Sequence, residues 1–165
     1  SPQNVEQFKQ NMQLNSDLLP FLALEETAVA DTVGTSVFEN GNNSYVGHLV
    51  PSAAQTGPGG SGGVTRVNTT TLDDYSERTG RWPNFVKIDA EGAESRILEG
   101  MTRILAKTRP ILLVEIHDAA SREFLTNFAK QHSYSSQRVA DDNRVRFEDY
   151  CSGEAEYLVL PDARP

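Results

Sequence analysis

The chain has 165 residues, of which 38% are apolar and 23% charged, and its 23 acidic side chains outnumber its 15 Lys and Arg to give a net charge of −8. This length and apolar content suit one folded domain. The acidic balance argues against non-specific nucleic-acid binding and against docking on an anionic membrane surface, because both need Lys and Arg. No apolar run approaches the roughly 20 residues of a membrane span.

The cysteine content is one residue, Cys151. A single thiol cannot form an internal disulfide and fits a reducing compartment. We therefore expect a cytoplasmic protein.

The N-terminal third predicts a helix followed by two strands. Val5, Phe8 and Met12 recur at helical spacing, and the polar residues 15–17 end that helix. Residues 22–29 and 35–39 read as two strands, which we expect to pair like a hairpin across the turn at 31–34.

Residues 51–63, "PSAAQTGPGGSGG", contain two Pro and five Gly. Such a segment cannot bury enough apolar surface to fix its own conformation. We expect a flexible loop there, either a lid over a site or simple disorder.

From residue 64 the pattern alternates strands and helices. Val64 and Val67 suggest an edge strand, and a Thr at 69–71 is a candidate N-cap. The further predicted elements are a helix over 72–78, a strand over 84–89, one helix from 90 to 107, a strand over 111–117, a helix over 121–131 and strands over 134–139 and 156–160. This alternation predicts an α/β domain with a largely parallel sheet. The uninterrupted "ILLV" at 111–114 is typical of a strand covered on both faces.

Two of these strands end in polar residues. Asp89 and Glu91 follow the first, and Glu115 and His117 end the second. If the strands are parallel neighbours, as the short crossover between them indicates, the four side chains meet at the sheet edge where α/β proteins bind ligands.

A purely structural explanation accounts for part of this charge. Glu91 and Glu94 favour the positive end of a helix dipole, and we expect Glu94 to face Arg96 or Arg103 in solvent. Lys87 shares a face with Asp89 and is its expected ion-pair partner. Glu115 is harder to explain, because burying a carboxylate is costly unless it is paired or hydrogen-bonded.

Metal binding is a further alternative at this edge. The four side chains are rich in oxygen, which suits Mg²⁺ or Mn²⁺ better than Zn²⁺. Carboxylate clusters without metal are common, so our prediction assigns no metal ligand and leaves a divalent cation as the less favoured option.

The block "VKIDAEGAESRILEGMTRILAKTRPILLVEIH" at 86–117 resembles the signature of the FkbM-type methyltransferases, K-I-D-x-E-G-A-E followed by a Pro-led strand ending E-x-H. Three upstream segments are also similar to that family: "AVADTVGTSVFE" at 28–39, "NGNNSYVGHLV" at 40–50 and "TTLDDY" at 70–75. The resemblance spans nearly the whole chain.

The resemblance implies a Rossmann-like class I methyltransferase fold, with a mostly parallel sheet and an antiparallel C-terminal strand. Residues 1–165 would then form one partial domain, because the family's first two strands and its Gly-rich cofactor loop have no counterpart here. We therefore expect an upstream segment of the same protein to complete the cofactor site.

The implied activity is S-adenosyl-L-methionine-dependent methylation of a hydroxyl on a small metabolite or sugar, with S-adenosyl-L-homocysteine as product. On the family's pattern, Asp89 lies beside the methionine portion of the cofactor, and Ala30 and Asp31 lie near its adenine. Asn43 and Ser44 line the acceptor pocket.

The same resemblance makes His117 or Glu91 the candidate general base, with Glu115 orienting His117 or the acceptor hydroxyl. Two other functions stay open. One is a non-catalytic binding or assembly module that has lost the cofactor, and the other is a metal-dependent hydrolase built at the same sheet edge.

Overall fold

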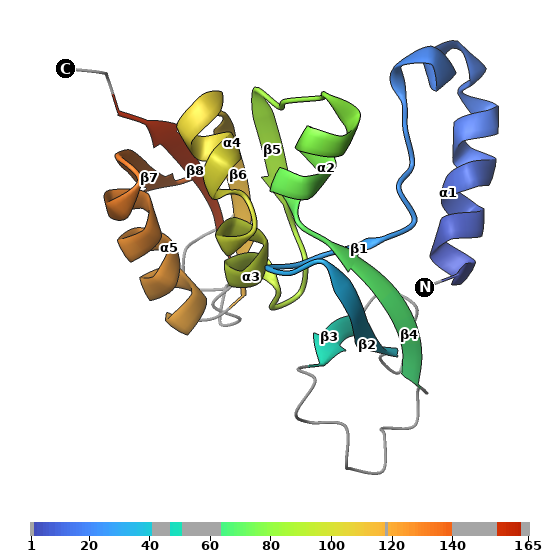
Figure 1. Ribbon diagram of the computed structural model, residues 1–165, viewed down its shortest axis with the longest axis horizontal. Coiled ribbons are helices and arrows are strands. Elements are labelled where there is room, and N and C mark those ends of the chain that lie inside the picture. Colours follow the sequence, from blue (N-terminus) through green and yellow to red (C-terminus); the bar gives the residue numbers. More distant parts are fainter. Residues whose placement is uncertain (1, 41–46, 51–63, 118, 140–154, 163–165) are drawn as a thin grey trace, which may run out of the picture. The chain divides into compact units, whose positions relative to one another are not determined.

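The computed structural model describes residues 2–40, 47–50, 64–117, 119–139 and 155–162. The chain divides into two compact units, one made of residues 1–28 and 34–69 and the other of residues 29–33 and 70–165. Figure 1 labels the elements of both units. No helix in the described part of the chain is long and apolar enough to cross a membrane.

The predicted N-terminal helix is present as α1 (Pro2–Leu14), and a 3₁₀ helix, η1 (Ser16–Phe21), follows it. The polar residues after Leu14 end the α-helix as expected, while Pro20 is accommodated in the 3₁₀ segment. Lys9 Nζ lies 2.6 Å from Glu26 Oε1, which ties the helix to the extended segment after η1.

The first sheet contains β1 (Ala28–Val29), β2 (Gly34–Asn40), β3 (Gly47–Val50) and β4 (Val64–Thr70), in the order β1-β4-β2-β3. The expected hairpin between 22–29 and 35–39 is therefore wrong, because β4 separates β1 from β2. Only two of the eight expected residues form β1. The seven-residue β4 offers β2 a longer partner, and it lies inside the sheet instead of at the expected edge.

The helix α2 (Leu72–Thr79) begins and ends with standard caps. Thr71 Oγ1 accepts a hydrogen bond from the backbone N–H of Asp74 at 2.9 Å, which confirms the predicted N-cap. Gly80 ends the helix in the left-handed region, with φ at +71°.

The second sheet contains β5 (Phe85–Ile88), β6 (Ile111–Ile116), β7 (Tyr134–Arg138) and β8 (Ala155–Pro161), in the order β5-β6-β8-β7. β5 and β6 are parallel neighbours, as predicted. β8 is antiparallel to both β6 and β7, so β5, β6 and β7 run one way and the C-terminal strand runs the other. The fold is therefore α/β with mixed sheets. The expectation of a largely parallel sheet is wrong for the described residues, because β5 and β6 pair in parallel whereas β2 with β3, β2 with β4, β6 with β8 and β7 with β8 are antiparallel.

The predicted helix over 90–107 is two helices, α3 (Glu94–Glu99) and α4 (Thr102–Lys107). The interruption falls at Gly100, where a Cβ atom would lie 2.4 Å from the backbone oxygen of Ala30. A side chain cannot fit at that distance, so close packing against residue 30 requires glycine. The next helix, α5 (Ala119–Gln131), begins two residues earlier than expected.

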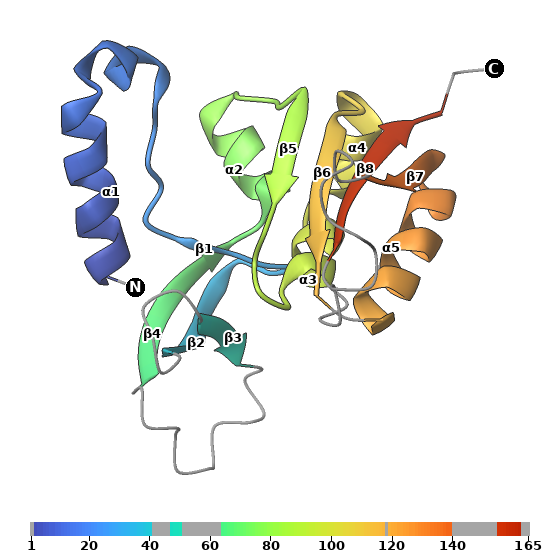
Figure 2. The ribbon, with the colours of Figure 1, turned by 180° about the vertical axis from the view of Figure 1, so that it is seen from behind.

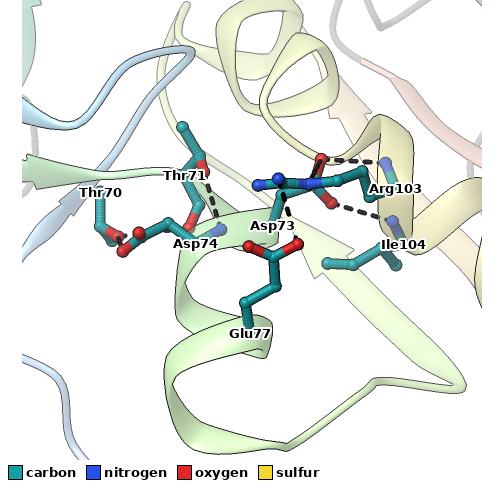
Figure 3. Close-up of polar contacts among 7 residues, drawn as sticks. All are labelled: Thr70, Thr71, Asp73, Asp74, Glu77, Arg103 and Ile104. Atoms are coloured by element: carbon teal, nitrogen blue, oxygen red, sulfur yellow. Dashed lines mark hydrogen bonds and ion pairs between the residues drawn. The ribbon is translucent and has the colours of Figure 1, made fainter.

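The N-terminus of α4 is capped by a side chain from α2 (Figure 3). Asp73 is 5% exposed, and its two carboxylate oxygens accept the backbone N–H groups of Arg103 and Ile104, each at 2.9 Å. These donors are among those that a helix cannot satisfy internally. Asp73 thus fixes the position of α4 relative to α2.

The helices α3, α4 and α5 supply the core on one face of the second sheet, and the two opposite views show α3 and α4 on one side of β6 (Figures 1 and 2). Leu112, Val114 and Ile116 point into this core, whereas Leu113 and Glu115 on the other face are half-buried. Among the described residues, β6 is therefore fully buried on the helix side and only partly covered on its other face, so the prediction that it is covered on both faces is borne out in part. An apolar run does not by itself show which face has a partner.

Candidate functional site

The turn from β5 to α3 carries the acidic stretch. Glu91 has φ at +47° and Gly92 has φ at +92°, so two consecutive residues adopt left-handed conformations. That conformation is uncommon for a residue with a side chain. The turn therefore holds Glu91 in a backbone conformation that local preference alone would not select.

Glu94 holds this turn in place. Its Oε1 accepts hydrogen bonds from the backbone N–H groups of Ala90 at 3.3 Å and Gly92 at 3.1 Å, and Glu94 is only 1% exposed. The expectation that Glu94 faces Arg96 or Arg103 in solvent is wrong. A carboxylate that satisfies backbone donors of its own turn is drawn inward, because these charge-assisted bonds offset part of its desolvation cost.

The ends of β5 and β6 bring three of the predicted site residues together. Asp89, Glu91 and His117 each offer one ligand atom, and these atoms all lie within 4.8 Å of one another. Asp89 and Glu91 are exposed, and the His117 side chain is 15% exposed. The Nε2 atom of His117 lies 3.6 Å from Oε1 of Glu94, which therefore approaches both the turn and the imidazole.

Lys87 is the partner of Asp89, as predicted. Its Nζ lies 3.0 Å from Asp89 Oδ2, and both side chains are nearly half exposed. The hydrogen bond and the charge of Asp89 raise the pKa of Lys87 above its ordinary value of 10.5. At this exposure such a pair contributes little to stability, so its main effect is to orient Asp89.

Glu115 lies on the face of the second sheet opposite the helices, directly across from Glu156 of β8. Burial raises the pKa of Glu115 above its ordinary value of 4.5, and the charge of Asp89 raises it further. His117 and Lys87 act in the opposite direction. A carboxyl whose pKa is raised by burial and by a neighbouring carboxylate is typical of a functional site, although charge networks of structural origin also raise pKa values.

The residues expected near the adenine, Ala30 and Asp31, come directly after β1 and make structural contacts. Ala30 is fully buried, and its backbone N–H donates to the Thr70 carbonyl oxygen at 2.9 Å. Asp31 Oδ1 accepts from Arg96 Nε at 2.8 Å and lies 2.7 Å from Arg96 Nη2. Asp31 thus ties residues 29–33 to α3. Asn43 and Ser44, and the expected loop at 51–63, lie outside the described residues.

Comparison with known families identifies the family of the chain. A profile of the methyltransferase FkbM domain matches residues 2–146. The chain belongs to the FkbM methyltransferase domain family. The resemblance found in the sequence is therefore confirmed.

A solved structure supports the same fold for this FkbM domain. The methyltransferase FkbM from Methylobacillus flagellatus KT aligns with a TM-score of 0.63 over 96% of this chain, at 14% sequence identity. At that identity the likeness establishes the fold alone. The alignment covers 34% of the longer protein, so this chain spans about a third of its length. A search of curated protein sequences found no significant match.

Two residues of this FkbM domain take structural parts that the sequence reading missed. Glu94 fixes the acidic turn, and Arg96 binds Asp31 from 65 positions away. The signal for Glu94 was its spacing, since an acid two residues after a glycine can reach back to the glycine N–H, as in a capping box. No local signal points from Arg96 to Asp31.

Proposed function

We propose that this FkbM domain belongs to an S-adenosyl-L-methionine-dependent methyltransferase that methylates a hydroxyl on a small metabolite or sugar. The observation that carries the proposal is the grouping of Asp89, Glu91 and His117 at the ends of parallel neighbouring strands, in a member of a methyltransferase family. Ligands bind at this edge of a parallel sheet. Within the same proposal, the second sheet is the later half of a Rossmann-like class I sheet, and the protein acts in the cytoplasm.

The charges at the site fit this cofactor. S-adenosyl-L-methionine supplies a methyl group on a positively charged sulfur, and its amino acid portion carries an ammonium group. Asp89, Glu91 and Glu115 place three carboxylates around the ends of β5 and β6. Negative charge of this kind favours a cationic ligand through simple electrostatic attraction.

Within this proposal the site residues divide into those that bind the cofactor and those that act on the acceptor hydroxyl. Asp89 holds the methionine portion, and Ala30 and Asp31 border the adenine. His117 or Glu91 accepts the proton of the acceptor hydroxyl as its oxygen takes the methyl group, and Glu115 orients His117 or that hydroxyl. Oε1 of Glu94 lies 3.6 Å from Nε2 of His117, beside this candidate base.

The proposal is tested by calorimetric titration of S-adenosyl-L-homocysteine into the 165-residue chain and into a form extended upstream. The extended form matters because the structural relative is about three times as long. We expect saturable binding that Asp89→Asn weakens at least tenfold, since it removes a charge facing the cationic portion. Glu99→Gln, an exposed acid on α3, is the matched control and should leave affinity unchanged.

Two results would contradict the proposal. Unchanged affinity in Asp89→Asn would remove Asp89 from the cofactor site. Absence of binding by both forms would favour a binding or assembly module without cofactor.

A further inference from the structure

We propose that Asp89, Glu91 and His117 bind a divalent transition-metal cation, for which Mn²⁺ is the best match. This proposal departs from the sequence expectation, which assigned no metal ligand. The cation site stands on side-chain geometry, whereas its part in methyl transfer rests on the proposed function.

The spacing of the three ligand atoms suits one cation. They lie within 4.8 Å of one another. A cation about 2.1 Å from each ligand atom holds any two of them at most roughly 4.2 Å apart. Asp89 and Glu91 are exposed, so small rotations of these two side chains close the set around His117.

A second observation comes from Glu94, which lies beside the cluster but is not one of its members. Its Oε2 is buried and has no hydrogen-bond partner among the described residues, while its Oε1 lies 3.6 Å from His117 Nε2. A histidine that binds a metal usually donates its other ring N–H to a carboxylate or carbonyl. The same Oε1 accepts the N–H groups of Ala90 and Gly92, so Glu94 is placed to fix both the acidic turn and the ring of His117.

The ligand chemistry selects among cations. One imidazole nitrogen and two carboxylate oxygens form a mixed set, which Mg²⁺ and Ca²⁺ favour less than Mn²⁺ does, because those hard ions prefer oxygen alone. Lys87 engages only Oδ2 of Asp89, so Oδ1 is available to a cation. Three protein ligands leave coordination positions for water or for the oxygen of an acceptor hydroxyl. On the proposed function, the cation would position that oxygen and lower its affinity for its proton, and Asp89, Glu91 and His117 would act as its ligands in place of the cofactor-holding and proton-accepting roles given to them there.

The experiment is a titration of Mn²⁺ into chelator-treated protein, followed by the electron paramagnetic resonance signal of free Mn²⁺. No cofactor or acceptor is present. We expect saturable binding of one Mn²⁺ per chain, in competition with Zn²⁺ and more weakly with Mg²⁺. Glu91→Gln and His117→Gln should each weaken binding at least tenfold, and Glu94→Gln on the order of tenfold or more by loosening His117.

Two controls make the titration decisive. Glu99→Gln removes an exposed carboxylate from α3 and should bind Mn²⁺ as the unmodified chain does. Circular dichroism verifies the fold of each variant, and Glu91→Gln keeps the test valid if the buried Glu94→Gln variant is unfolded, because Glu91 is exposed.

The outcomes separate this proposal from the proposed function. The cation site is overturned if the unmodified chain shows no saturable Mn²⁺ binding, or if Glu91→Gln and His117→Gln bind Mn²⁺ as tightly as the unmodified chain does. Either result counts even if S-adenosyl-L-homocysteine binds. Mn²⁺ binding that these variants abolish supports the site even if S-adenosyl-L-homocysteine does not bind, in which case the methyltransferase proposal fails and the metal-dependent hydrolase gains support.

Discussion

Glu115 carries a charge at a position where both burial and neighbouring carboxylates oppose it. Burial raises its pKa first, and Asp89 and Glu156 raise it further. A carboxyl whose pKa is higher in the folded chain binds its proton more tightly there than in the unfolded chain. The free energy of unfolding therefore falls as the pH rises from about the ordinary value of 4.5 through the raised pKa.

We predict that Glu115→Gln is more stable than the unmodified chain at pH 7.5 and equally stable near pH 4, where the carboxyl is protonated in both states. The measurement is thermal unfolding across this pH range in the presence of a chelator. Glu123→Gln, an exposed acid on α5, serves as the control and should show no such pH-dependent gain. A lower melting temperature for Glu115→Gln at pH 7.5 would show that its charge is stabilised by a contact stronger than its burial.

A destabilising charge at Glu115 fits the part that the proposed function gives to this residue. Stability and activity commonly oppose each other at active sites, because the groups that act on a ligand are unsatisfied without it. Asp89 and Glu115 lie at the ends of neighbouring strands and repel each other, so a cationic ligand bound between them would relieve this repulsion.

At the scale of elements, the pair α2 and α4 depends on one side chain. Asp73 accepts the N–H groups of Arg103 and Ile104, and the Arg103 side chain lies 3.5 Å from Asp73 and 3.1 Å from Glu77 (Figure 3). α4 has no side-chain cap of its own. Its N-terminus is therefore satisfied by a residue 30 positions earlier in the chain.

We predict that Asp73→Ala lowers the free energy of unfolding by about 1–3 kcal/mol, because it leaves the buried N–H of Ile104 and the partly buried N–H of Arg103 without their acceptor. Urea denaturation measures this change. Glu77→Gln, which removes only an exposed ion pair with Arg103, should cost less than about 1 kcal/mol. Equal losses in the two variants would mean that Asp73 acts through the charge of Arg103 and not as a cap.

The elements that the sequence predicts well are those with local signals. α2 has Thr71 and Gly80 at its ends, and β5 and β6 are apolar runs that end in polar residues. The same strand ends correctly brought Asp89, Glu91 and His117 together. What the sequence could not supply were contacts between distant segments.

Two such contacts account for the main differences. The approach of Gly100 to Ala30 interrupts a run of helical periodicity. A glycine inside such a run does not by itself end a helix, so the sequence predicts one helix where the fold has two. The burial of Glu94 follows from the left-handed turn at Glu91 and Gly92, whereas an acid at a helix start ordinarily faces solvent.

Across the whole molecule, the apolar core is concentrated in one of the two units. Every buried apolar side chain among the described residues belongs to residues 29–33 or 70–165. In the other unit, Thr69 is the only described side chain that is buried, and α1, η1 and the segment after them expose several large apolar side chains: Phe8, Leu14, Leu18, Leu19, Phe21 and Leu22. The stabilisation that comes from burying apolar side chains is therefore concentrated in the unit formed by residues 29–33 and 70–165.

We predict that amide hydrogen exchange of the 165-residue chain shows two levels of protection. Amides of α1 should exchange with little protection, because a 13-residue helix with no fully buried side chain among its described residues is only marginally stable in water. Amides of β6, which is paired on both sides by β5 and β8 and packed under the helices, should exchange only through global unfolding. Mass spectrometry of peptides from the two units measures the difference, and the slope of exchange against added denaturant identifies the global level.

Protection of α1 equal to that of β6 would mean that the exposed apolar side chains of α1 and η1 are covered in solution, by a second copy of the chain or by residues outside those described here. Concentration dependence of that protection separates the two explanations, since only association between copies weakens on dilution.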